Sequence, residues 1–274
     1  RLLFTNNHIV TKRFNVSAMN KHDKILNGIT IVFTIAMNYI SNTGIFNKET
    51  ISTISTNYRN LFTPDGYAFS IWGIIYLGLL AFDFYFGPIF MTNPIKESII
   101  SKLKWWFFFF FVCNCLWIIC WINDYLFLSV ILMTVLFIAL IRILTNYKHS
   151  LQTYDIKIRL FFEIPFQIYA GWISVALIAN IAAYLKKIQW TAFGASPDFW
   201  TLIMIAIAIT VHLYMLWKQN LFFFTIVISW ALAAIAVANK NTNQLIYLSS
   251  IIGSALIVIN LILYAYKKWL KKRK

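Results

Sequence analysis

Long runs of apolar residues, separated by short polar stretches, fill most of this 274-residue chain. A helix needs roughly 20 apolar residues to cross the hydrocarbon of a bilayer, because its backbone groups must bond within the helix there. Eight segments meet this description, and the first is shorter than the others: residues 25–41, 67–86, 104–122, 125–144, 160–185, 199–217, 221–239 and 245–266. The pattern therefore predicts an all-α integral membrane protein with about eight transmembrane helices.

Composition excludes an ordinary soluble domain. The chain is 60% hydrophobic and only 12% charged, whereas about a quarter of the residues in soluble proteins are charged. Most of its 24 Lys and Arg residues fall on one side of the eight-helix map. The exceptions are Lys48, Arg59, Lys186, Lys187 and Lys240. The positive-inside rule then puts both termini in the cytoplasm, and the net charge of +15 indicates contact with anionic lipid and not with nucleic acid.

The same map divides the chain into four parts. Residues 1–24 form a basic cytoplasmic tail, and residues 25–185 form a core of five helices. Residues 199–266 form three additional transmembrane helices, and residues 267–274 form a second basic cytoplasmic tail. The first 24 residues lack the pattern of a cleavable signal peptide, and Met19 is a more natural start than Arg1. We therefore expect residues 1–18 to be an unstructured extension, and a bacterial inner membrane to be the location.

Aromatic and polar side chains recur at helical spacing on three of the predicted helices. Residues at i, i+3 or i+4, and i+7 share one helical face. The three faces carry Trp72, Tyr76, Leu79 and Asp83; Asn114, Trp117 and Trp121; and Tyr169, Trp172, Ala176 and Asn180. Gly73, Gly78 and Gly171 would let the helices approach closely, which leaves the aromatic faces for a shared interior. Two interpretations stay open, because in a chain with 18% aromatic residues such alignments also arise in a packed core or a lipid-facing surface.

Polar groups inside the predicted helices allow two interpretations as well. Asn114 and Asn180 could contact a ligand or link two helices, because an amide in hydrocarbon needs a partner in either case. His212 stands alone, which favours a structural or water-facing side chain over a haem or metal ligand. The three cysteines share one helix without a nearby His or carboxylate, which favours inert buried thiols: Cys113, Cys115 and Cys120. No metal site, covalent cofactor or catalytic residue is predicted.

The aromatic residues also fall into motifs that resemble the TspO/MBR family, the tryptophan-rich sensory proteins related to the mitochondrial translocator protein. In that family a Pro-rich loop leads into a helix with a Trp and, four residues later, a Tyr. Pro64 precedes Trp72 and Tyr76 in the same way. The next helix of the family carries an L-N-x-x-W element, which Asn114 and Trp117 match.

A third motif lies on the last helix of the family's five-helix core. The family pattern there is P-Y-x-x-W with an Asn eight residues after the Trp, and Tyr169, Trp172 and Asn180 keep that spacing. The chain departs from the family at Cys113, which replaces the Leu before the Asn, and at Ile168, which replaces the Pro. The motifs span about 120 residues of the predicted five-helix core.

The resemblance implies a five-helix bundle around a pocket for porphyrins, haem or other flat hydrophobic molecules, capped by the long loop after the first helix. Flat ligands stack on indole and phenol rings, and one amide or hydroxyl can fix their orientation. We expect residues 42–66 to close the pocket from the non-cytoplasmic side. The expected ligand-binding residues are Trp72, Tyr76, Asn114, Trp117, Trp121, Tyr169, Trp172 and Asn180.

Three functions follow from this interpretation. The first is a membrane binding or sensory protein, or a translocator, for a tetrapyrrole or a similar flat ligand. The second is a transporter of hydrophobic or amphiphilic molecules, which would use the three additional helices, although no inverted repeat is recognisable. The third is a porphyrin-modifying enzyme, although no nucleophile–base pair or metal cluster is visible. The expected partners are the lipid bilayer and a hydrophobic small molecule, and the Gly- and Ala-lined faces permit a homodimer or a partner membrane protein.

Overall fold

The computed structural model describes residues 21–41, 43–45, 48–86, 94–148 and 156–273, and these contain helices and no strands. Eight long helices make up this described part: α1 (Lys21–Ser41), α3 (Ile71–Phe86), α4 (Pro94–Ile122), α5 (Leu126–Lys148), α7 (Ile164–Lys187), α8 (Pro197–Gln219), α9 (Phe222–Asn239) and α10 (Gln244–Arg273). Five short elements join them: α2 (Ile51–Asn57), η1 (Gly66–Ser70), α6 (Ile156–Ile158), η2 (Arg159–Glu163) and η3 (Ala192–Gly194). The predicted all-α class is confirmed.

Each predicted transmembrane segment coincides with one of the long helices. Seven helices in the described chain are long and apolar enough to cross a membrane. In α1, the apolar stretch found among the described residues is Val32–Ser41. The predicted number of about eight holds for the long helices of the described chain.

Two very tight turns form the predicted hairpins. Asp124 lies between α4 and α5 with φ of 64°, and Asn220 lies between α8 and α9 with φ of 55°. Asp and Asn tolerate this left-handed region better than other side chains with a Cβ. At the start of α8, Ser196 accepts a hydrogen bond from the backbone N–H of Phe199 (3.2 Å), and Pro197 fits the first turn because it lacks an N–H. Local chemistry thus sets these helix ends.

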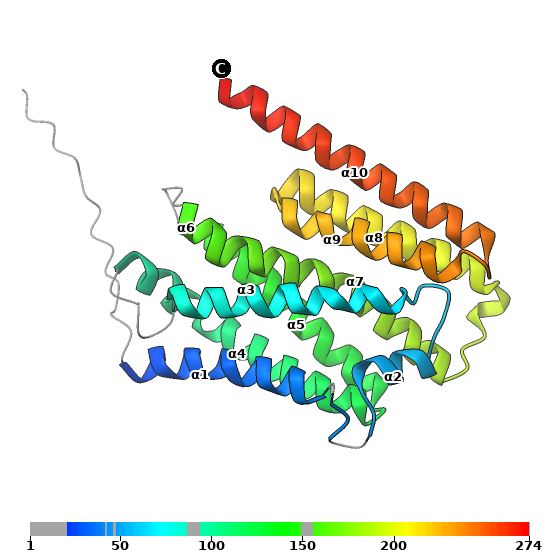
Figure 1. Cartoon of the computed structure of the whole chain (residues 1–274), viewed down its shortest axis with the longest axis horizontal. Helices are drawn as coiled ribbons and strands as arrows, with labels where there is room; N and C mark the ends of the chain where they lie inside the picture. The colour runs from blue at the N-terminus through cyan, green and yellow to red at the C-terminus, as the bar shows by residue number, and fades with distance from the viewer. Residues whose placement is uncertain (1–20, 42, 46–47, 87–93, 149–155, 274) are drawn as a thin grey trace, which may run out of the picture.

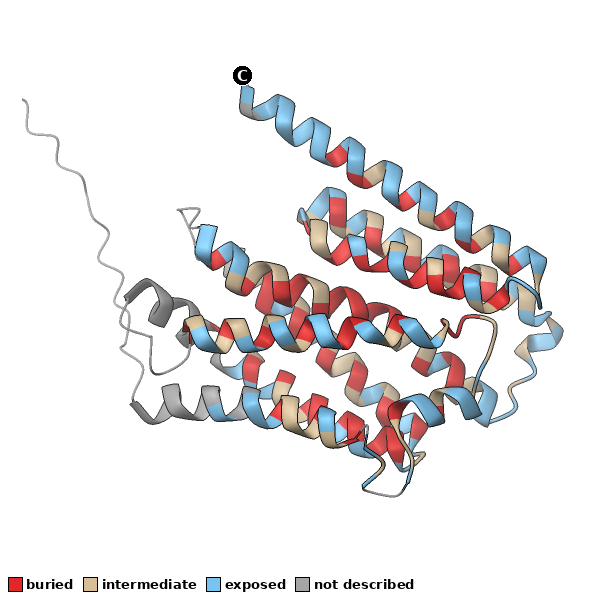
Figure 2. Ribbon diagram, viewed as in Figure 1, coloured by how far each residue is buried: buried red, intermediate tan, exposed pale blue. Residues whose placement is uncertain are grey.

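The helices run back and forth along one axis, so α1 begins and α10 ends at the same end of the bundle (Figure 1). This arrangement agrees with the predicted parity of the spans, while the cytoplasmic location of that end stays a prediction. The helix α7 packs against α3, α5 and α9, and α9 in turn packs against α8 and α10. Figure 2 shows that α7 is largely buried and that α10 is mostly exposed.

Glycine lets two pairs of helices approach each other closely. A Cβ on Gly171 of α7 would lie 2.5 Å from the backbone oxygen of Phe224 in α9, and a Cβ on Gly78 of α3 would lie 2.9 Å from Cβ of Pro165. These two close approaches agree with the sequence prediction. The prediction of a close helix contact was wrong for Gly73. This glycine is exposed, and no atom lies within 4 Å of the Cβ that a larger residue would carry there. Gly171 thereby joins the last three helices to the first five.

Buried polar side chains also link the helices. His212 on α8 is 1% exposed, its Nδ1 lies 2.8 Å from the backbone oxygen of Ala208, and its Nε2 lies 3.3 Å from Oγ of Ser174 on α7. The hydroxyl of Thr225 on α9 donates to the backbone oxygen of His212 (3.0 Å). These contacts support the structural interpretation of His212. The three cysteines are buried and free, as expected.

Candidate ligand-binding site

A narrow cavity lies at the end of the bundle that is opposite to the termini, between α3, α4, α5 and α7 and beneath residues 51–64. It encloses about 610 Å³, a figure that includes the open space at its mouth. The space that a water-sized molecule can occupy inside it is only about 60 Å³, well below the 300–1,000 Å³ or so of common small-molecule pockets. The cavity is therefore a narrow slot with an open mouth, and we refer to it below as the aromatic slot.

Five of the eight predicted site residues line the aromatic slot: Trp72, Trp117, Trp121, Trp172 and Asn180. The Trp72 ring stacks against Trp117, with ring centroids 6.5 Å apart and an angle of 25° between the planes. It meets Trp172 edge to face at 6.4 Å, and Trp117 stacks on Trp121 at 6.1 Å. Indoles from three helices thus converge on one space.

The other three predicted residues lie outside the slot lining, and the two tyrosines among them pack against Trp72. Tyr76 stacks on the Trp72 ring at 5.6 Å, and Tyr169 meets it edge to face at 5.8 Å. The Asn114 amide donates to the Tyr169 hydroxyl, and its carbonyl accepts a hydrogen bond of 2.8 Å from Asn38 on α1. Asn114 therefore links α1, α4 and α7. These bonds support the interpretation that its amide connects helices.

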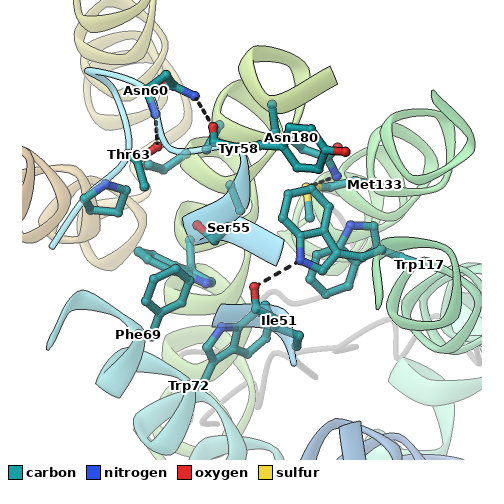
Figure 3. A pocket seen from close by; sticks show the side chains of 17 residues that line it. Ile51, Ser55, Tyr58, Asn60, Thr63, Phe69, Trp72, Trp117, Met133 and Asn180 are labelled. Atoms are coloured by element: carbon teal, nitrogen blue, oxygen red, sulfur yellow. Dashed lines mark hydrogen bonds between the residues drawn. The ribbon is translucent and has the colours of Figure 1, made fainter. Parts of the chain in front are cut away.

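Asn180 links α7 to α5 and also lines the aromatic slot. Its carbonyl oxygen accepts a hydrogen bond of 2.9 Å from Ser129 on α5, and its amide nitrogen lies 3.8 Å from the sulfur of Met133. In the slot it lies close to Met133 (Figure 3). Its role as a ligand contact stays a prediction.

Three buried polar atoms around the slot have no hydrogen-bond partner among the described residues: the hydroxyl of Tyr76 and the Nε1 atoms of Trp117 and Trp172. Leaving a buried donor unsatisfied costs about 1–3 kcal/mol, so folded proteins rarely retain such groups without a reason. The two tryptophans line the slot. Their free N–H groups are suited to an acceptor on a bound molecule.

The roof of the slot is formed by residues 51–64, which we call the cap. Its helix α2 begins at a capping box: Thr50 accepts from the Thr53 N–H (3.1 Å), and the Thr53 hydroxyl accepts from the Thr50 N–H (2.8 Å). The indole N–H of Trp121 donates to the backbone oxygen of Ile51 (3.1 Å), which fixes the cap to α4 (Figure 3). Of the expected loop 42–66, residues 51–64 thus cover the slot.

The cap also contacts the turn between α4 and α5. Tyr58 of the cap lines the slot and is hydrogen-bonded to Asp124. Partial burial, this hydrogen bond and the negative charge of Asp124 raise the pKa of the Tyr58 hydroxyl, so it stays protonated and able to donate. Asp124 in turn forms an exposed ion pair with Lys187 of α7 (2.6 Å).

The far end of the cap is attached to α9. The amide of Asn239 donates to the backbone oxygen of Leu61 (3.0 Å), and the Asp65 N–H donates to the backbone oxygen of Ala234 (3.1 Å). The indole N–H of Trp230 donates to the backbone oxygen of Ala68 in η1 (3.3 Å). One of the three last helices therefore holds the segment that covers the slot, a role that no sequence motif indicated.

Trp121→Phe should loosen the cap. The substitution keeps an aromatic ring in the slot but removes the hydrogen bond to Ile51. Losing a hydrogen bond of this kind costs about 1 kcal/mol, so amide hydrogen exchange in residues 50–58 should become about fivefold faster. Trp105→Phe is the control, because Trp105 lies on the same helix and is 69% exposed. Equal exchange rates in the two variants would show that Trp121 does not secure the cap.

The fold and the slot together define a membrane-embedded helical bundle with a capped aromatic cavity. A family model described as TSPO-like protein matches residues 24–263, so the chain belongs to the TSPO-like family. The match includes α8, α9 and residues 244–263 of α10. Membership indicates a membrane protein of the sensory or translocator type. No curated protein and no solved structure matches the chain.

Proposed function

We propose that this protein is a non-enzymatic membrane receptor or translocator that binds a flat hydrophobic molecule of the tetrapyrrole class in the aromatic slot. One observation supports the proposal above the others. Four indoles from α3, α4 and α7 converge on the slot, and two of them have buried N–H groups without a partner in the part of the chain that the structure describes. Rings supply the stacking surface, and the free donors supply a polar contact that fixes orientation.

The size of the slot implies that the cap moves when a macrocycle binds. The space inside the slot is only about 60 Å³, which is too little for a porphyrin ring. Ile51, Ser55, Tyr58, Asn60, Thr63 and Pro64 of the cap form one side of the lining. If the cap swings away, the indoles become accessible from the end opposite to the termini. A ligand would then replace the cap's contacts with stacking contacts.

A metal-free ring fits the lining better than haem does. Haem iron usually takes a His, Cys, Met or Tyr ligand from the protein. The described lining residues include no His or Cys; Met133 contacts the Asn180 amide, and the Tyr58 hydroxyl bonds Asp124. Stacked aromatic pairs contribute about 0.5–1.5 kcal/mol each beyond burial. Several of them together with burial would give an affinity in the micromolar range, about 8 kcal/mol.

Titration of the purified full chain with protoporphyrin tests the proposal. Saturable quenching of tryptophan fluorescence in the micromolar range is expected, because stacking brings the ligand against several indoles. A non-planar hydrophobic molecule of similar size should quench weakly, since it cannot stack. Absence of saturation, or equal quenching by both molecules, would exclude the slot as a site for flat ligands. If binding is saturable, ligand-dependent flux in proteoliposomes would distinguish a translocator from a receptor.

A further inference from the structure

A second and much larger cavity lies beside the aromatic slot at the same end of the bundle. Its volume is about 1,080 Å³, or about 2,250 Å³ when the space at its open side is included. Its walls are the second half of α7, the connection to α8, the first half of α8, the end of α9 and residues 59–63 of the cap. We call it the lateral cleft.

The long walls of the lateral cleft are apolar and continue onto the surface that faces lipid. Ile178 and Ile181 of α7 stand on one side, and Ile203 and Ile207 of α8 stand on the other. Ile181 is 39% exposed and Ile207 is 50% exposed. A cleft that opens sideways between two transmembrane helices is filled by hydrocarbon in a bilayer. A hydrocarbon chain is therefore the natural occupant of this part.

The mouth of the cleft carries two cations. Arg59 and Lys186 line it, and the Lys186 ammonium donates to the backbone oxygen of Arg59, which holds the two residues together. In the described chain neither side chain pairs with a carboxylate, whereas the neighbouring Lys187 is paired with Asp124. The sequence places few Lys and Arg residues at this end of the bundle, yet two of them converge here.

Aromatic and polar groups surround these cations. The rings of Trp190 and Trp200 pack together with centroids 4.9 Å apart, and the Trp200 indole donates to the backbone oxygen of Ala192 (3.1 Å). Tryptophan is enriched at the level of lipid headgroups. Gln189 and Thr191 line the same mouth and provide further hydrogen-bonding groups. Apolar walls below and unpaired cations above match the two ends of an anionic lipid.

We propose that the lateral cleft binds an anionic phospholipid, with an acyl chain between α7 and α8 and the phosphate against Arg59 and Lys186. The evidence for this site does not rest on a ligand in the aromatic slot. The two cations at the mouth favour an anionic lipid. A zwitterionic headgroup would add a third positive charge beside Arg59 and Lys186. Most of the described lining is apolar. An acyl chain can fill such a space and a soluble phosphate ester cannot, so we infer a lipid and not a free phosphate ester.

Binding of phosphatidylglycerol to the full chain in neutral detergent tests the assignment. Added phosphatidylglycerol is expected to raise the melting temperature saturably, while phosphatidylcholine has little effect. Brominated acyl chains should quench Trp190 and Trp200, and the quenching should fall in the Trp190→Phe/Trp200→Phe variant. Equal effects of the two lipids would overturn the role of the cations. Equal binding of soluble glycerol phosphate would overturn the role of the apolar walls.

Arg59→Gln with Lys186→Gln should weaken phosphatidylglycerol binding by roughly tenfold, because each Lys or Arg beside an anionic headgroup strengthens binding several-fold. Lys48→Gln with Lys240→Gln is the matched control. It removes the same charge from the same end of the bundle, at exposed residues outside the cleft lining. A second variant, Ala182→Phe, fills the apolar part and should weaken binding without any change in charge. Unchanged binding in both cleft variants would overturn the proposal.

Discussion

Gly171→Ala is expected to destabilise the protein more than alanine at any other glycine that the structure describes. The new Cβ would lie 2.5 Å from the backbone oxygen of Phe224 and 3.1 Å from Cβ of Val227. A backbone atom cannot rotate away as a side chain can, so α9 must move off α7. Overpacking of a tight contact typically costs about 1–3 kcal/mol, and we expect about 3 kcal/mol here.

The buried thiols of the chain provide the measurement. Cys113, Cys115 and Cys120 are free and buried, so a thiol-reactive dye will label them only when the bundle opens. The melting temperature of Gly171→Ala should fall by about 5 °C or more. Gly73→Ala is the control, because nothing lies within 4 Å of the added Cβ, and alanine favours a helix over glycine by about 1 kcal/mol. Equal melting temperatures for the two variants would contradict the close contact.

Replacing Trp72 and Trp172 together by alanine is expected to weaken protoporphyrin binding by roughly tenfold or more, because each stacked ring contributes about 0.5–1.5 kcal/mol beyond burial. Trp72 lies at the centre of the aromatic cluster, in contact with Trp117, Tyr76 and Tyr169 as well as Trp172. The two rings come from α3 and α7. Their loss therefore removes the stacking surface on two sides of the slot.

Ligand absorbance is the better signal here, since the substitutions remove fluorophores. Trp105→Ala with Trp269→Ala is the control, because these indoles are 69% and 46% exposed. Trp72→Leu with Trp172→Leu refills part of the space without a flat surface and should bind as weakly as the alanine pair. Thiol labelling identifies variants that fail to fold. A folded pair with unchanged affinity would place the ligand elsewhere.

The positions of the helices could be predicted because a transmembrane helix is specified by its own residues. A run of apolar side chains long enough to cross hydrocarbon is visible without knowledge of its neighbours. The shared interior could be predicted in part for the same reason, since helical spacing fixes which side chains face the same way. Trp72, Trp117 and Trp172 accordingly line one cavity.

The roles of individual polar groups could not be predicted, because they depend on contacts between distant segments. Asn114 was compatible with a ligand contact or a link between helices, and its bonds with Asn38 and Tyr169 make it a link. The cap depends on a hydrogen bond between Asn239 and Leu61, which are 178 positions apart. Helical spacing contains no information about such pairs. The attachment of the cap to α9 therefore emerges only from the structure.

Asn60 and Thr63 line both the aromatic slot and the lateral cleft, so one short piece of chain is the partition between them. A displacement of this partition alters the volume of both compartments at once. If both compartments bind as proposed, occupancy of one would be energetically coupled to occupancy of the other, and thermodynamic linkage would make the coupling reciprocal. Lipid composition would thus set the sensitivity of the protein to its ligand, and the ligand would change the lipid that the protein retains by the same factor.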